Sequence, residues 1–197
     1  MDSLFKIKNE VLNCKKCSLY KERVKNGFYP VIGEGNHKAK IIFVGEAPGF
    51  NEARTSHPFC GAAGKILGQL LKSVAIERKE VYITNILKDR PANNRVPKPE
   101  EIKACGPYLD RQIKIIKPKI VCTLGNYSTK YIFKKYGLED EIQGISKIHG
   151  KIFSAFGKDG QFNGVKIIPL YHPAVVVYNQ NMKQALEKDF KILEKFK

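Results

Sequence analysis

The stretch "KIIFVGEA" (residues 40–47) decides the fold class. It is a short, nearly continuous apolar run that ends in a Gly/Pro turn, a pattern typical of a strand buried on both faces of a sheet. Three more segments have this character: "VYITNIL" (81–87), "KIVCTLG" (119–125) and "VKIIPLYHPA" (165–174). The sequence therefore predicts four buried strands.

Segments with helical spacing of apolar residues separate or follow these strands, at residues 62–75, 98–117, 127–137 and 181–196. Pro99 and the two acids after it are a good helix start. Strands that alternate with helices predict an α/β fold, in which a parallel sheet is covered by helices on both faces. A hairpin is also expected in residues 150–168, turning at Lys158-Asp159-Gly160.

Length and composition indicate one globular domain, residues 1–197, with 43% hydrophobic and 27% charged residues. The longest apolar runs are far too short to cross a bilayer. The first ten residues mix charges with apolar residues and do not form the apolar core of a signal peptide. We therefore expect an intracellular, cytoplasmic protein.

Charge points to a polyanionic partner. The chain has 35 basic and 19 acidic residues, a net charge of +16 that is spread along its whole length. Such an excess repels itself and is usually kept for nucleic acid. The alternative is an ordinary solvated surface rich in lysine.

The cysteines favour a metal or cluster site over disulfides. There are five of them, at positions 14, 17, 60, 105 and 122, an odd number for a disulfide framework. The "CKKC" motif at 14–17 has the spacing that lets two thiolates face one ion.

A ligand site is expected at the carboxyl ends of the predicted strands, because ligands of open parallel sheets bind there. The residues at these ends are Gly45 to Gly49, Asn85, Gly125-Asn126 and Tyr171-His172-Pro173. The "GEAPG" turn is not a dinucleotide fingerprint, since it lacks GxGxxG spacing and Pro48 removes an amide. Its glycines instead let a planar ligand approach the backbone.

In this order, the motifs "VGEAPGFNE", "HPFCGAAG", "YITN…RPANNRVPKPEE…C" and "HPA" closely resemble the family 4 uracil-DNA glycosylases, iron–sulfur enzymes of base-excision repair. The resemblance runs from Cys14 to the last helix. It implies a three-layer α/β/α sandwich around a four-stranded parallel sheet. It also implies hydrolysis of the N-glycosidic bond of deoxyuridine, flipped out of uracil-containing DNA, to leave an abasic site without cutting the strand.

The resemblance assigns three residues to the base. Phe59 would stack on the uracil ring, although its residue type alone favours simple core packing. The Asn85 amide would accept from N3–H and donate to O4, a pattern that cytosine reverses. His172 would be catalytic, donating a hydrogen bond to O2 as the leaving uracil becomes an anion.

The first motif carries the remaining pocket residues. Ala47 stands where other uracil glycosylases have a water-orienting aspartate, so no side-chain base is expected there. Glu46 is the nearest carboxylate and a second catalytic candidate, with backbone capping as its alternative role. Gly45 and Glu46 belong to the substrate-binding set. Gly49 sits where other families block the thymine methyl group with a tyrosine, and Glu52 takes that role here.

Residues 173–181 resemble the loop that enters the minor groove of the DNA. Val175, Val176, Val177 and Tyr178 are apolar enough to act as a wedge, although they are also an ordinary start for the last helix. Tyr171 could face the core or the DNA backbone.

The resemblance also implies a [4Fe–4S] cluster with four cysteine ligands. Cys14, Cys17 and Cys105 match three of them, and Asp89 stands at the fourth position. Asp89 as the fourth ligand is favoured; a three-iron cluster, another thiol or a zinc site are the alternatives. Cys60 and Cys122 are interpreted as buried apolar residues.

Two rival functions are a glycosylase with broader base specificity and a non-catalytic, cluster-bearing DNA-binding protein. We expect a monomer, since one flipped base needs one pocket.

Overall fold

A six-stranded sheet forms the centre of the computed structural model, which describes residues 2–155 and 164–196. Its strand order is β1-β3-β2-β4-β6-β5. The strands are β1 (Glu34–Gly35), β2 (Ile41–Gly45), β3 (Tyr82–Asn85), β4 (Ile120–Leu124), β5 (Phe153–Ser154) and β6 (Lys166–Leu170). All four strands expected from the sequence are present, and β2 pairs in parallel with both β3 and β4.

The sheet is wider than the four strands that the resemblance implied. Two-residue strands, β1 and β5, pair antiparallel with β3 and β6 and make the sheet mixed. Such short edges limit pairing with a second chain. The hairpin expected before β6 is represented by the β5–β6 pair, and its predicted turn at Lys158-Asp159-Gly160 lies outside the described residues.

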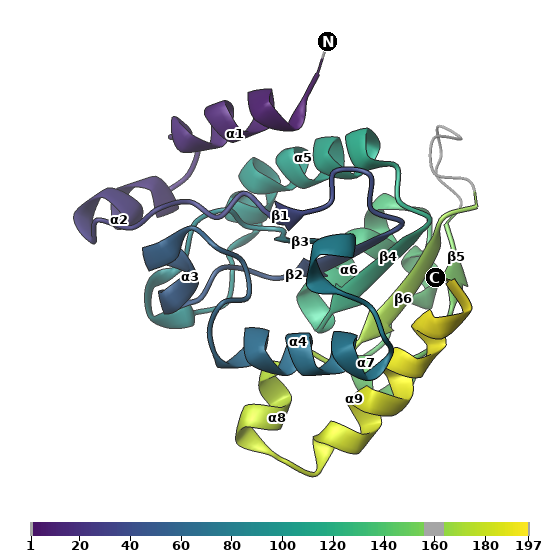
Figure 1. Cartoon of the computed structure of the whole chain (residues 1–197). Helices are drawn as coiled ribbons and strands as arrows, with labels where there is room; N and C mark the ends of the chain where they lie inside the picture. The colour runs from purple at the N-terminus through teal and green to yellow at the C-terminus, as the bar shows by residue number, and fades with distance from the viewer. Residues whose placement is uncertain (1, 156–163, 197) are drawn as a thin grey trace.

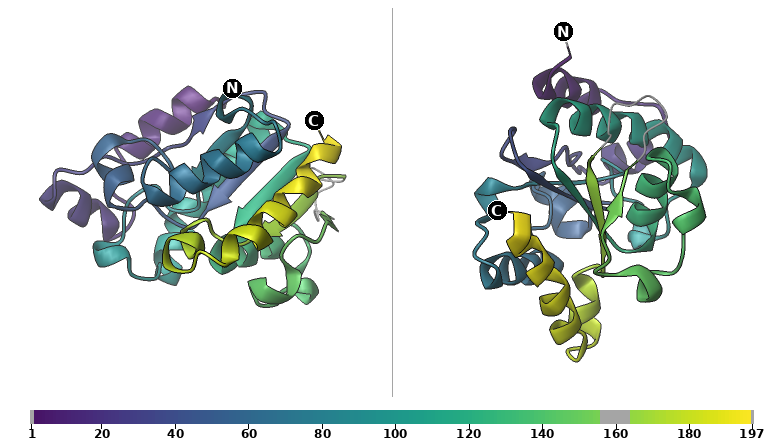
Figure 2. Two further views of the ribbon diagram at one scale, coloured as in Figure 1. Left: turned by 60° about the horizontal axis from the view of Figure 1, so that its bottom comes forward. Right: turned by 90° about the vertical axis from the view of Figure 1, so that its right-hand side faces the viewer.

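Helices cover both faces of the sheet, as Figures 1 and 2 show. The helices are α1 (Leu4–Leu12), α2 (Leu19–Lys25), α3 (Phe50–Thr55), α4 (Ala62–Ser73), α5 (Pro99–Ile116), α6 (Asn126–Lys135), α7 (Ile145–Ile148), α8 (Ala174–Tyr178) and α9 (Met182–Phe190). Short 3-10 helices lie at Arg78–Glu80, Ala92–Asn94, Glu139–Glu141 and Lys191–Phe196. The last predicted helix therefore changes to 3-10 geometry after Phe190.

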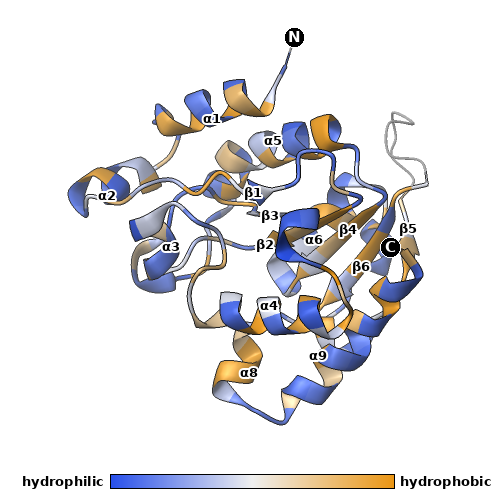
Figure 3. Ribbon diagram, in the orientation of Figure 1, coloured by the Kyte–Doolittle hydropathy of each residue, from blue (hydrophilic) through white to orange (hydrophobic). Residues whose placement is uncertain are grey.

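Alternate residues of each strand enter two separate cores. Ile41 and Phe43 of β2 pack on the side of α4, α8 and α9, whereas Ile42 and Val44 pack on the side of α5 and α6. This follows from the two-residue period of a strand. Figure 3 shows the apolar strands enclosed by helices that mix polar and apolar residues, with α8 mostly apolar. Burying each such side chain contributes roughly 1.5–3 kcal/mol to folding, so both faces hold the sheet.

Helix α5 illustrates how the sequence sets an element's limits. Pro99 occupies its first turn, and the Glu101 carboxylate accepts from the backbone N–H of Lys98 as part of a capping box. Leu109, Ile113 and Ile116 line its buried face. The helix ends where Lys117 adopts a left-handed conformation, with φ of 53°.

None of the helices within residues 2–155 and 164–196 combines the length and hydropathy that crossing a bilayer requires.

Candidate active site

The parallel strands deliver the predicted site residues to one edge of the sheet. Gly45 and Asn85 are the last residues of β2 and β3, and they are direct partners in the register. His172 follows β6 by two residues. Three segments distant in sequence therefore meet at the carboxyl edge, as expected from the fold class.

A cavity of about 340 Å³ opens at this edge. The predicted residues that line it are Ala47, Gly49, Glu52, Phe59, Asn85 and His172. It is large enough for a single small ring, and it combines one aromatic face with convergent polar groups.

The Asn85 amide is held for a ligand. The side chain is buried, only 2% exposed, and its Oδ1 has no hydrogen-bond partner among the described residues. A buried acceptor without a partner costs about 1–3 kcal/mol, so the fold tolerates this cost at the cavity wall. A Cβ placed on Gly45 would collide with this oxygen and lie 2.8 Å from Cζ of Phe59. Glycine is therefore required beside both side chains.

Lys88 fixes the strand end behind Asn85. Its ammonium group is fully buried and lies 2.8 Å from Thr84 Oγ1, the Asn85 carbonyl oxygen and Gln112 Oε1. Burial lowers the pKa of Lys88 to about 7. This support was missed from the sequence, because a lysine after an apolar strand usually indicates a turn to solvent.

Phe59 forms the aromatic wall in a strained conformation. Its φ is 49°, a region that bulky residues rarely adopt and that costs about 1–3 kcal/mol. Its ring centroid lies 5.6 Å from that of His172, with the planes tilted by 32°. Gly64 of α4 packs so closely on the Phe59 carbonyl group that a side chain there would clash. Close packing thus maintains the strain.

His172 is oriented and neutral. The backbone N–H of Ala174 donates to its Nδ1 at 3.2 Å, which leaves the proton of the neutral ring on Nε2. Burial lowers the pKa of His172 to about 4, although the nearby Glu52 carboxylate acts in the opposite direction. At neutral pH the ring therefore has an N–H donor without a positive charge.

Glu52 connects the first motif to the start of α4. Its Oε1 accepts from the backbone N–H groups of Cys60 at 3.0 Å and Gly61 at 2.9 Å. Its other carboxylate oxygen lies against Gly49, where a Cβ would be 2.6 Å from it. The carboxylate therefore closes one side of the cavity.

A second cavity of about 200 Å³ adjoins the first through Ala47, Gly49 and His172. Glu46 lines this second cavity, and burial raises the pKa of its carboxyl group. Asn94 lines both cavities, with a φ of 53°, and was not assigned a role from the sequence. The "PANNR" run was the available signal, since asparagine tolerates left-handed backbone.

Helix α8 narrows the predicted wedge to two residues. Val177 is 47% and Tyr178 is 89% exposed, and both line the cavity. Val176 is fully buried and Val175 packs against the core, so neither can enter a groove without unfolding the helix. Tyr171 also packs against this core and stacks near His149, with ring centroids 4.3 Å apart.

The four residues expected to hold an iron–sulfur cluster are not arranged as a metal site in the described part of the chain. Among the described residues, no three His, Cys, Asp or Glu side chains are grouped to hold a metal ion. Cys14 packs beside Tyr108, whereas Cys17 and Cys105 pack with Leu19 and Leu87. A hydrogen bond from the Cys105 thiol lowers the pKa of Cys17 to about 7. Cys17 and Cys105 thus lie together, and the charge of Asp89 also acts on the pKa of Cys17.

Asp89 is engaged by a cation. Nη1 of Arg23 lies 3.1 and 3.2 Å from its two carboxylate oxygens, and both side chains are buried. Burial raises the pKa of Asp89, an effect that the Arg23 guanidinium partly offsets. A metal bound by Asp89 would therefore have to share this carboxylate with Arg23. Of the other two cysteines, Cys122 is buried as expected, but Cys60 is exposed.

Comparisons with known proteins identify the family. The model of the uracil DNA glycosylase superfamily matches residues 32–195. A type-4 uracil-DNA glycosylase from Sulfurisphaera tokodaii is 52% identical over 97% of this chain and 83% of the relative. Another from Archaeoglobus fulgidus is 45% identical over 97% and 92%, and one from Thermotoga maritima is 38% identical over 89% and 83%. The chain therefore belongs to the uracil DNA glycosylase superfamily.

Proposed function

We propose that this protein is a DNA repair enzyme that hydrolyses the N-glycosidic bond of deoxyuridine in DNA, releasing uracil and leaving an abasic site. The observation that carries this is the Oδ1 of Asn85, which has no hydrogen-bond partner within residues 2–155 and 164–196; the side chain lines one small cavity together with Phe59 and His172. Relatives named type-4 uracil-DNA glycosylases, at 45% and 52% identity over nearly the whole chain, support it.

Base recognition depends on Asn85. Oδ1 accepts the N3–H of uracil, and the amide nitrogen donates to O4. Cytosine has an acceptor at N3 and an amino group at C4, so it would leave both pairs mismatched. Phe59 stacks on the ring, a contact worth about 1–3 kcal/mol.

Catalysis depends on His172. As the glycosidic bond breaks, negative charge grows on uracil O2, and the Nε2–H group of the neutral imidazole donates to it. A preoriented donor in a partly buried site stabilises such charge without reorganisation. The hydrogen bond from Ala174 to Nδ1 keeps this tautomer in place.

The attacking water has no carboxylate at position 47. Ala47 lies between the two cavities, and the polar groups of Glu46 and Asn94 line the smaller one. We assign this smaller cavity to the water, held by side-chain and backbone polar groups.

DNA binding requires the deoxyuridine to leave the stack, because its glycosidic bond cannot be reached in a duplex. Val177 and Tyr178 are the exposed apolar side chains at the rim of the cavity, and they take the place of the flipped base. The net charge of +16 suits the phosphate backbone. Glu52 and Gly49 exclude the thymine methyl group, and one pocket per chain suits a monomer.

An iron–sulfur cluster would use Cys14, Cys17 and Cys105 and would need a fourth ligand. Thiolates are the donors that such clusters prefer. Asp89, the residue at the fourth position, is paired with Arg23. No step of the reaction described above passes through this region of the protein.

The test is uracil release from a uracil-containing oligonucleotide, detected by strand cleavage after alkali treatment. We expect His172→Ala and Asn85→Ala each to lower the single-turnover rate by about 10²–10³-fold. His37→Ala, at an exposed histidine outside the cavity, is the matched control and should retain the rate. Full activity in both site variants would overturn the proposal.

A further inference from the structure

The guanidinium group of Arg23 connects four parts of the chain. Besides the Asp89 carboxylate, it donates to the carbonyl oxygens of Val11, Leu12 and Cys14 at 3.1–3.3 Å. Arg23 itself lies on α2, Val11 and Leu12 end α1, Cys14 lies between these helices, and Asp89 follows β3. Figure 1 shows this N-terminal segment lying beside α5 on one side of the molecule.

A second, partly buried contact ties the same segment to α5. The Ser18 hydroxyl donates to Oε1 of Glu101 at 3.2 Å, and Arg95 pairs with both oxygens of that carboxylate. Glu101 is completely buried. Three parts of the chain carry the expected cluster ligands: the Cys14–Cys17 loop, the residues after β3, and α5. Polar contacts within the chain therefore join all three.

These contacts conflict with a cluster that uses Asp89. A bond from Asp89 to iron would have to share the carboxylate with Arg23, whose Nη1 contacts both oxygens at a buried site, and it would weaken this ion pair. Iron–sulfur clusters also prefer soft thiolates to carboxylate oxygen. Such a bond would weaken a well-satisfied ion pair for the sake of a poorer ligand.

We propose that this protein folds without an iron–sulfur cluster, and that the buried Arg23–Asp89 ion pair takes over the cluster's task of fastening the N-terminal segment to the sheet domain. The cysteine-to-aspartate change at position 89 and the arginine at position 23 then act as a pair. This inference concerns folding and metal content, so it stands or fails independently of the glycosylase activity.

Metal content gives the first test. The full chain is purified without oxygen, incubated with iron and sulfide under reducing conditions, desalted and analysed for iron, sulfide and zinc. We expect a colourless protein with far less than one metal atom per chain. Three or four irons per chain with visible absorption, or one tightly bound zinc, would overturn the proposal.

Thermal unfolding gives the second test. Arg23→Met and Asp89→Leu should each lower Tm by about 10 °C, because each leaves a buried charge unpaired. The double variant should lose much less than the sum of the two. Lys79→Met, which breaks the exposed Lys79–Glu77 pair, is the control and should change Tm by about 1 °C or less. Additive losses, or a lower Tm of the wild type after treatment with a chelator, would contradict the proposal.

A third test restores the expected ligand. The variant Asp89→Cys with Arg23→Met has thiols at all four positions and no cation between them. We expect it to take up iron and sulfide under the conditions that leave the wild type colourless. If both proteins take up a cluster, or if neither does, the pair at positions 23 and 89 does not decide metal content and the proposal fails.

Discussion

The imidazole of His172 illustrates how one residue's surroundings set its chemistry. A histidine exposed to water is half charged near pH 6.5. At this site burial lowers the pKa to about 4, and the Ala174 amide fixes the tautomer. The result is a neutral donor that keeps its state across the physiological range, as the role proposed for it toward the leaving uracil requires.

This pKa has a consequence for stability that can be measured. Between about pH 6.5 and 4, the unfolded chain binds a proton at His172 that the folded chain does not, so the contribution of His172 to stability is lost as the pH falls. The His172→Gln variant lacks this effect, whereas the other titrating groups are common to both proteins. We therefore expect the Tm of the wild type minus that of the variant to decrease from pH 7 to pH 5. If the difference in Tm between the two proteins does not change with pH, His172 has the same pKa in the folded and unfolded chains, which contradicts this prediction.

Gly45 is a second residue whose role follows from its surroundings. A methyl group there would meet Oδ1 of Asn85 and the Phe59 ring. We expect Gly45→Ala to lower kcat/KM for uracil excision by at least about 10²-fold. The added methyl group would displace the Asn85 amide, and a base bound to the displaced amide would be out of position for the reaction. Gly68→Ala is the matched control: its added methyl group meets nothing within 4 Å, and it should stabilise α4 by about 0.5–1 kcal/mol. Equal activity in the two variants would contradict this role.

Among the elements, the short helix α8 divides its residues between two tasks. Its buried residue, Val176, fastens the helix to the core beside α4, and its exposed end presents Val177 and Tyr178 at the cavity. A wedge requires such an arrangement, because a side chain can enter DNA only if the backbone behind it is anchored.

Variants of α8 can separate anchoring from DNA contact. We expect Tyr178→Ala to leave Tm unchanged but to lower excision from a duplex more than from a single strand, where no stack must be filled. Val176→Ala should instead lower the free energy of unfolding by about 1–3 kcal/mol. Equal losses on duplex and single-stranded substrates for Tyr178→Ala would exclude the wedge.

At the scale of the whole molecule, the continuous apolar runs predicted the four central strands, and the helical spacing predicted the covering helices. The same runs predicted that Asn85 and His172 lie at strand ends, because that position is a property of the local sequence. The left-handed backbone of Phe59, the buried ammonium of Lys88 and the partnership of Arg23 with Asp89 depend on contacts between segments far apart in the chain. In the sequence alone, Lys88 and Arg23 look like any lysine or arginine exposed to solvent. Edge strands of two residues are likewise too short to produce a pattern.

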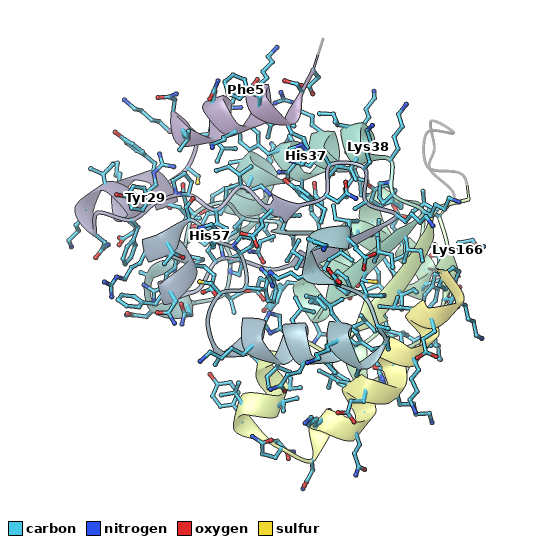
Figure 4. The ribbon with its side chains drawn as sticks, in the orientation of Figure 1. Phe5, Tyr29, His37, Lys38, His57 and Lys166 are labelled. Carbon is cyan, nitrogen blue, oxygen red and sulfur yellow. The ribbon has the colours of Figure 1, made fainter. Side chains whose placement is uncertain are left out.

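Charge is the property that belongs to the molecule as a whole, and its net value of +16 is spread along the whole sequence. Figure 4 shows Lys38 and Lys166 far from Tyr29, which lies toward the end at which the strands finish. If DNA lies across the strand ends, only basic residues on that side release counterions, and each phosphate contact contributes about 0.9 to the slope of log K against log salt. We expect Arg54→Gln, on α3, the helix whose Glu52 lines the cavity, to reduce this slope by about 1 in anisotropy titrations with a duplex that carries an abasic site. Lys38→Gln removes the same charge before β2 and should leave the slope unchanged. Equal effects of the two variants would mean that binding follows net charge alone, and DNA would then have no fixed path over the cavity.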